Sequence, residues 1–317
     1  MIRNFIGQSL VRPKVTFFHV ILNFSYLCAM LKLQTPVVDL KCKVGISYED
    51  KIMMLGSCFS DNIGRQLSDF GFDVCVNPFG TLYNPISILR SIEMLAGEGS
   101  FGPEDCLQIG AGDERWCSFS HHTSFARTSK DEFLNNANAA LADAREFFKE
   151  SNKIVITLGT AWCFKHVVRE HIVSNCLKRP ASEFVRERLS SSEVTSSLSR
   201  IAELCTGKEI IFTVSPIRHF KDGAHGNQIS KSALLLGVDD FLQSTSCAAD
   251  YFPAYEIMMD ELRDYRFYAE DMCHPSAQAV DYIRERFLSW ALPPAEHTRL
   301  EENIRAFKRM SHTAIGH

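Results

Sequence analysis

Short apolar runs alternate with amphipathic segments along most of the chain. A short run of β-branched and other apolar residues predicts a buried strand, and apolar residues at helical spacing predict a helix. This alternation favours an α/β domain with a central parallel sheet and helices on both faces. It predicts strands at 52–55, 72–76, 154–158 and 210–214, helices at 129–148, 191–206, 228–245 and 276–290, and two further helices that begin near 58 and 85.

The loops that follow these strands hold the candidate chemistry, because the carboxyl ends of parallel strands form the ligand-binding edge of such a sheet. The first of these loops offers a serine, Ser57, and a thiol, Cys58, and the second contains a glycine with a flexible backbone amide, Gly80. The last loop offers Arg218 and His219, which suit a substrate carboxylate or phosphate but equally suit a structural ion-pair cluster.

Cys58 stands between a strand end and a helix start, where it is exposed at the sheet edge. The helix N-terminus favours negative charge and so favours the thiolate. Ser57 is the alternative nucleophile if the turn is displaced by one residue; if Cys58 is the nucleophile, we expect Ser57 to cap the helix.

The segment Asp271-Met272-Cys273-His274 precedes the last predicted helix. An aspartate three residues before a histidine can place its carboxylate against one ring nitrogen, which leaves the other free to serve a nucleophile. The alternative is a structural turn that Asp271 caps, with His274 bonded to the backbone.

Composition narrows the class of protein. A formal net charge of -4 without a polybasic run gives no reason to expect nucleic acid or an acidic membrane as partner. The eleven cysteines are scattered, which favours free thiols in a reducing, cytoplasmic compartment. No glycine-rich phosphate loop is present, so no cofactor is expected. No metal is expected either, because the candidate ligands do not reproduce a known spacing, and the histidines among them are interpreted as surface or lid histidines; the candidates are Cys117, His121, His122, His166 and His171.

The remaining segments define the predicted domain organisation. Residues 1–29 form an apolar, partly basic extension, interpreted as the product of an upstream start or as a targeting segment, so export or membrane anchoring stays open. The main domain is predicted over 30–292 and a helical tail over 293–317. Two irregular stretches, 98–128 and 163–190, are predicted to build a lid.

Several separate blocks of the chain resemble the GSCFA family, a group related to the SGNH (GDSL-like) hydrolases. The signature is Gly56-Ser57-Cys58-Phe59, and further matching blocks are Asn77 to Thr81, Tyr83 to Pro85, Ser215 to His219, Lys221 to Gly223, Tyr251 to Glu256 and Asp271 to Pro275. The resemblance implies a three-layer α/β/α sandwich with a parallel sheet, of the SGNH-hydrolase or flavodoxin-like kind.

The resemblance also implies catalytic roles. In SGNH enzymes the nucleophile stands two residues after a glycine. A later Asp-x-x-His supplies the general base, its histidine, and the aspartate that orients that histidine. This register gives Cys58 the nucleophile position, Gly80 the oxyanion-binding block, and Asp271 and His274 the last pair. The SGNH hydrolases carry a Gly-x-Asn-Asp block, and Gly159-Thr160-Ala161-Trp162 stands in its place here. The asparagine side chain that would donate to the oxyanion is therefore missing. Asn84, His219 and Thr160 are the candidates to replace that donor.

The sequence therefore predicts an acyl esterase acting on an acylated small molecule or carbohydrate through a Cys/Ser-His-Asp mechanism. Two alternatives stay open: an acyltransferase, and a non-catalytic ligand-binding protein that retains the fold. The expected partner is a small-molecule or glycan ester, and the sequence does not predict an oligomeric state.

Overall fold

A computed structural model describes residues 35–38 and 41–314, with side chains up to residue 310. The chain divides into two units, 1–36 and 37–317, and everything below concerns the second unit. The interpretation of residues 1–29 lies outside the described residues. None of the described helices combines the length and the apolar character that crossing a bilayer requires.

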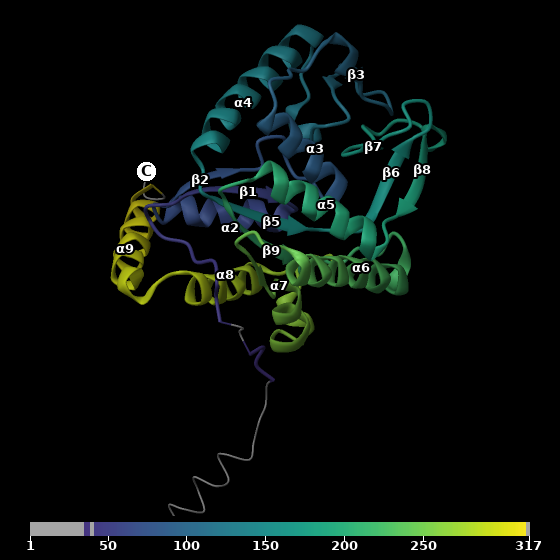
Figure 1. Cartoon of the computed structure of the whole chain (residues 1–317). Coiled ribbons are helices and arrows are strands. Elements are labelled where there is room, and N and C mark those ends of the chain that lie inside the picture. The colour runs from purple at the N-terminus through teal and green to yellow at the C-terminus, as the bar shows by residue number, and fades with distance from the viewer. Residues whose placement is uncertain (1–34, 39–40, 315–317) are drawn as a thin grey trace, which may run out of the picture. The chain divides into compact units, whose positions relative to one another are not determined.

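Five parallel strands form the central sheet (Figure 1). They include all four strands that the sequence predicts. In the order of the sheet they are β2 (Asp73–Val76), β1 (Lys51–Gly56), β5 (Lys153–Leu158), β9 (Glu209–Val214) and β10 (Ala249–Phe252). Numbered along the chain this is the order 2-1-3-4-5 of flavodoxin-like folds, in which ligands bind where β1 meets its non-sequential neighbour. That neighbour is β5, whose Ile156 pairs with Leu55.

The helices cover both faces of the sheet, as predicted. Alternate residues of β1 enter two separate cores, because successive side chains of a strand point to opposite faces. Met53 and Leu55 join one core, and Ile52 and Met54 join the other. The described helices are α2 (Cys58–Asp69), α3 (Pro85–Ala96), α4 (Lys130–Glu150), α5 (Ser191–Leu204), α6 (Gly223–Ser244), α7 (Ala254–Glu256), α8 (Ala277–Ala291) and α9 (His297–Ala314).

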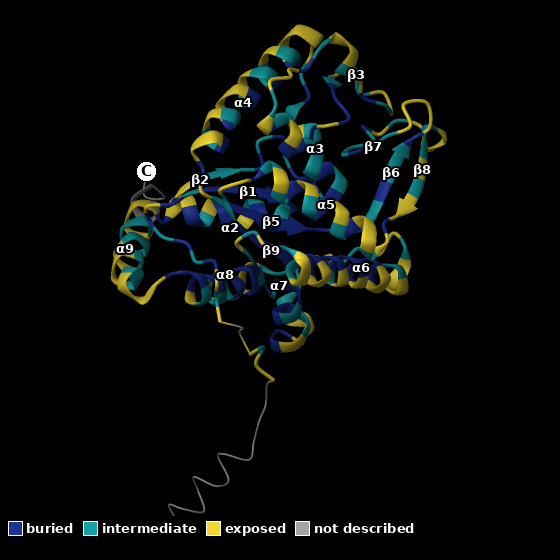
Figure 2. Ribbon diagram, viewed as in Figure 1, coloured by how far each residue is buried: buried dark blue, intermediate teal, exposed yellow. Residues whose placement is uncertain are grey.

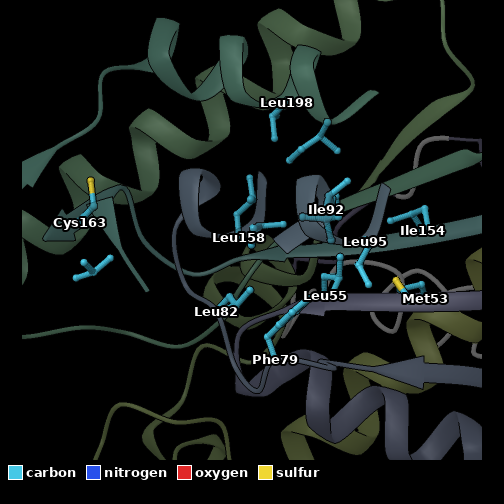
Figure 3. Packing of buried hydrophobic residues seen from close by; sticks show 14 of the residues in the cluster. Met53, Leu55, Phe79, Leu82, Ile92, Leu95, Ile154, Leu158, Cys163 and Leu198 are labelled. Carbon is cyan, nitrogen blue, oxygen red and sulfur yellow. The ribbon is translucent and has the colours of Figure 1, made fainter. Parts of the chain in front are cut away.

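The core on the side of Met53 and Leu55 receives residues from α3, α4, α5 and α6 (Figure 3). The other core receives residues from α2 and α8. Figure 2 shows the strands as the buried centre, with exposed residues on the outer faces of the helices. The predicted three-layer α/β/α sandwich is therefore confirmed.

The prediction that 163–190 is an irregular lid is wrong. This stretch builds an antiparallel sheet from β6 (Trp162–His166), β7 (Ile172–Val173) and β8 (Phe184–Arg188), in the order β7-β6-β8. β7 has only two residues, and β6 and β8 contain charged or basic residues among their apolar ones, so none of the three forms a continuous apolar run.

The stretch 98–128 is also ordered into the folded body. It contains a small hairpin, β3 (Leu107–Gln108) with β4 (Trp116–Cys117). Several of its side chains are buried in the core beside α4, and they include Phe101, Ile109, Cys117, Phe119 and His121. Burial of His121, and of His166 in β6, contradicts the interpretation of these two residues as surface or lid histidines.

Candidate active site

The nucleophile candidate lies at the point that the topology favours, directly after β1. Gly56 ends the strand with a φ of 137°, and a Cβ atom there would lie 2.2 Å from the carbonyl oxygen of Thr157 on β5. The next amide, of Ser57, donates to that same oxygen at 3.2 Å. Only a glycine allows β1 and β5 to approach so closely where the chain turns into α2.

Ser57 and Cys58 have different environments. Ser57 is buried, and its hydroxyl caps α2 by accepting the amide of Phe59 at 3.3 Å. Cys58 is the first residue of α2 and is partly exposed. The expectation that Ser57 caps the helix beside Cys58 is confirmed.

The electrostatics of Cys58 differ from the expectation of an activated thiol. Burial raises the pKa of the Cys58 thiol, and the nearby Asp61 carboxylate raises that pKa further. The backbone N–H groups of Cys58 and Phe59 and the charge of Lys231 lower it, as a helix N-terminus should, but burial outweighs them. The thiol therefore needs a general base.

The loop after β2 holds the turn around Cys58 in place. Asn77 accepts the amide of Gly56 with its side-chain oxygen at 2.8 Å and donates to the Asp61 carboxylate at 2.5 Å. Gly80 has a φ of 77°, and its amide donates to the carbonyl oxygen of Asn77 at 2.7 Å. In this structure the Gly80 amide therefore closes a turn and is not directed toward a substrate.

Two further predicted binding residues make structural hydrogen bonds. Asn84 caps α3 by accepting the amide of Ser87 at 2.9 Å. The Thr160 hydroxyl lies 3.0 Å from that of Ser230 and accepts the amide of Trp162 at 3.0 Å. Neither side-chain oxygen is left without a protein partner.

Asp271 and His274 form the pair that the sequence predicts. Asp271 Oδ2 lies 2.5 Å from His274 Nδ1, and Asp271 Oδ1 accepts the amides of Cys273 and His274, each at 2.9 Å. These two amides, and then the imidazole, hold the pKa of Asp271 at about 2. The pair is half exposed, and His274 Nε2 makes no hydrogen bond within residues 35–38 and 41–310.

The loops after β9 and before α8 are joined at this pair. The amide of Arg218 donates to the carbonyl oxygen of Cys273 at 3.1 Å. His219 packs edge-on against Tyr83, with ring centroids 6.3 Å apart. Burial, followed by the charges of Lys231 and His274, lowers the pKa of His219 to about 4. His219 therefore stays neutral between the two loops.

Cys58 belongs to the same group of residues. Tyr83 has its pKa raised by burial and, to a lesser degree, by the charge of Cys58. Tyr83 in turn contacts His219, whose pKa responds to His274. Cys58 follows β1 and His219 follows β9, so both come after carboxyl ends of sheet strands, and the loop of Asp271 and His274 is joined to the loop after β9 through Arg218 and Cys273.

Lys231 on α6 was missed by the sequence analysis. It is 1% exposed, and its ammonium donates to the carbonyl oxygens of Gly159 and Ser215, each at 2.7 Å. Burial lowers its pKa to about 7, and the charge of Cys58 acts in the opposite direction. The signal was its place on the buried face of α6, four residues after Asn227 and three before Leu234.

A parallel sheet of flavodoxin-like order with helices on both faces defines an α/β protein, in which Cys58 begins the helix after the first strand of the sheet. The family model for the GSCFA family matches residues 51–287, which include all of these residues. The chain belongs to the GSCFA family.

Among solved structures, the chain is similar to an acetyl xylan esterase (Est2A) from the rumen bacterium Butyrivibrio proteoclasticus, with 11% sequence identity and a TM-score of 0.33. The match covers 77% of this chain and 65% of that chain, slightly less than two thirds of its length. No curated protein matches the chain.

Proposed function

We propose that the protein is an acyl esterase in which Cys58 is the nucleophile, His274 the general base and Asp271 the residue that orients the imidazole. The observation that carries this proposal is the 2.5 Å contact between Asp271 Oδ2 and His274 Nδ1, on a loop that is joined to the loop after β9, together with the partly exposed thiol at the start of α2. The contact fixes one ring nitrogen as the donor and leaves Nε2 to accept a proton.

The reaction follows from these positions. His274 Nε2 takes the thiol proton as the sulfur of Cys58 attacks the acyl carbon. The tetrahedral intermediate collapses, the alcohol leaves with the proton from His274, and a thioester remains. Water, deprotonated by His274, then releases the carboxylic acid and restores the thiol. The raised pKa of Cys58 makes proton transfer to His274 part of the attack rather than a step before it.

The oxyanion contact falls to the backbone N–H of Cys58, which lies at the start of α2 and interacts with the Cys58 thiol itself. Gly80 was expected to supply the second amide, but its amide is bonded to Asn77. The Gly80 amide joins the oxyanion contact only if that turn opens. Cys58 is favoured over Ser57 because Ser57 is buried and caps the helix.

The test uses the full chain and p-nitrophenyl acyl esters, with intact mass and burst kinetics as readouts. Wild type should form an acyl adduct, which Cys58→Ala and His274→Ala should abolish. The matched control is Cys176→Ala, because Cys176 is also half-buried with a pKa raised by burial; it should keep the adduct. Loss of the adduct in Ser57→Ala alone would assign the nucleophile to Ser57, and no adduct in wild type would favour a ligand-binding protein.

A further inference from the structure

A cavity of about 570 Å³ opens beside the loop that carries Asp271 and His274. Arg218, on its wall, donates its amide to Cys273, and the amide of Ala269 donates to the carbonyl oxygen of His274 at 2.8 Å. Tyr268, also on the wall, pairs with Pro275 in an isolated antiparallel bridge. The cavity wall is therefore joined to the chain on both sides of His274, the proposed base. The cavity volume is typical of small-molecule sites.

The cavity carries an uncompensated positive charge. The guanidinium of Arg218 lies over two rings, 4.4 Å from the centroid of Phe220 and 5.4 Å from that of Tyr268. Within residues 35–38 and 41–310, no carboxylate lies within ion-pair distance of Arg218 or of Arg263, which lines the same cavity. Arg186, by contrast, also lies over two rings but is paired with Asp222.

One carboxylate lines the cavity, that of Asp264, and it is engaged elsewhere. It caps the turn at Tyr265–Phe267 by accepting the amide of Arg266 at 2.9 Å, and it lies 3.9 Å from the Arg266 guanidinium. The Arg218 side chain is held by stacking and by a hydrogen bond to the Tyr268 hydroxyl, and because a guanidinium has five N–H donors, donors remain for a ligand carboxylate.

Apart from these charged residues and the amides of Asn227 and Gln228, the cavity is lined by apolar or aromatic residues. Tyr255, Met258 and Leu262 are buried core residues that also line it. Tyr265 lines it with a 70% exposed side chain, a large aromatic surface left open to solvent. A ligand that fits must combine an apolar body with a negatively charged group.

We propose that this cavity binds the alcohol part of the ester, and that this alcohol carries a carboxylate on an apolar ring or chain. The inference rests on the proposed function. The alcohol leaves by taking the proton of His274, so it must lie near His274, whose neighbours Cys273 and Pro275 are joined to the cavity residues Arg218 and Tyr268. Arg218 fixes the carboxylate and the aromatic wall packs against the apolar body.

A binding experiment tests the cavity without any turnover. The probes are 4-(hydroxymethyl)benzoate and 4-methylbenzyl alcohol, which have similar shapes and differ in charge, titrated into the full chain by calorimetry. We expect the carboxylate to bind at least about tenfold more tightly, the effect of one charge-assisted contact. Arg218→Met should remove the difference, and Arg200→Met, an exposed arginine on α5, should keep it.

Equal binding of the two probes to wild type would overturn the inference, as would an unchanged preference in Arg218→Met. If Arg218→Met does not fold, Arg263→Met decides, since Arg263 is exposed and makes no ion pair in the described part of the chain. That variant should lose preference for the carboxylate several-fold, and an unchanged preference would count against the inference.

Turnover of two esters separates this inference from the proposed function. The acetate ester of 4-(hydroxymethyl)benzoate should show a kcat/KM about tenfold above that of 4-methylbenzyl acetate. Arg218→Met should lose this preference and still hydrolyse both esters. Equal kcat/KM values would show that the cavity does not hold the alcohol part. Selective binding of the carboxylate without turnover of either ester would contradict the proposed function. It would still support the cavity as a binding site for a carboxylate on an apolar body.

Discussion

The ammonium of Lys231 lies 2.7 Å from the carbonyl oxygen of Ser215, the first residue after β9. The same ammonium is 2.7 Å from the carbonyl oxygen of Gly159, the first residue after β5. A single buried side chain thus joins the carboxyl ends of two adjacent strands. Its charge and that of Cys58 act on each other, so it links the scaffold to the proposed nucleophile.

Replacing Lys231 should slow the reaction of Cys58 with an alkylating agent. In Lys231→Met the thiol loses a nearby positive charge that lowers its pKa, so less thiolate is present at a given pH. We expect the Cys58 peptide to react with iodoacetamide several-fold more slowly at pH 6, where Lys231 with its pKa of about 7 is still charged, measured by peptide mass spectrometry.

The matched control is Lys208→Met. Lys208 also donates to backbone carbonyls, those of Phe148 and Ser151, each at 2.6 Å, and burial also lowers its pKa. It follows α5 and precedes β9, so it lies at the amino end of the sheet, away from Cys58. An equal slowing in both variants would show that the effect is structural rather than electrostatic.

Lys231 should also make stability depend on pH. Its pKa is about 7 in the folded protein and near 10.5 when exposed, so between these values the unfolded chain binds more protons. The contribution of Lys231 is therefore complete above the unfolded pKa and is lost as the pH falls through 7. The free energy of unfolding of wild type, relative to that of Lys231→Met, should rise by about 1–2 kcal/mol from pH 7 to 8.5.

Urea unfolding of both proteins at matched ionic strength measures this difference. The window ends at 8.5 because the buried thiols begin to titrate above it in the unfolded chain. A constant difference across the window would mean that Lys231 does not change its protonation on folding.

Gly56→Ala should destabilise the protein by more than its backbone conformation alone explains. The φ of 137° is unfavourable for alanine, which costs about 1–3 kcal/mol, and the added Cβ would also meet the carbonyl oxygen of Thr157. Gly112→Ala isolates the first cost, because Gly112 has a φ of 77° and no atom lies within 4 Å of an added Cβ. Urea unfolding should show a clearly larger loss in the free energy of unfolding for Gly56→Ala than for Gly112→Ala. Equal losses would mean that β1 and β5 can separate at that point without a cost in free energy.

Much of this arrangement could be predicted from the sequence because it depends on local patterns. The strands with continuous apolar runs, such as Ile154 to Leu158, were recognisable, and so were the Asp271-His274 spacing and the cap at Ser57. β10 was missed because Ala249–Phe252 contains one buried apolar residue, Phe252, and pairs with a single neighbour, β9.

What could not be predicted depends on residues that meet only in three dimensions. The pKa of Cys58 reflects burial by distant segments, which overrides the helix terminus. His121 is buried against Phe101 and Phe125, with ring centroids 4.5 and 4.7 Å away, and burial lowers its pKa to about 3. The role of Lys231 required knowing that α6 presents it to Gly159 and Ser215.

The role of Asp271 can be separated from its structural contribution by two substitutions. Asp271→Asn keeps an oxygen that can accept the amides of Cys273 and His274, so the turn should be retained. It removes the negative charge beside His274 Nδ1, which holds the imidazole in the orientation and tautomer that a base requires. Asp271→Ala removes both contributions.

We expect Asp271→Asn to unfold at the wild-type urea concentration and to lose about 10²–10⁴-fold in the kcat of ester hydrolysis, the usual contribution of a general base. Asp113→Asn is the control, since Asp113 also accepts a backbone amide, that of Arg115, also has its pKa held at about 2, and is paired with Arg115 rather than with a histidine. Asp271→Ala should lose stability as well as turnover. Full turnover in Asp271→Asn, with an intact fold, would remove Asp271 from the mechanism and leave it the cap of the turn before α8.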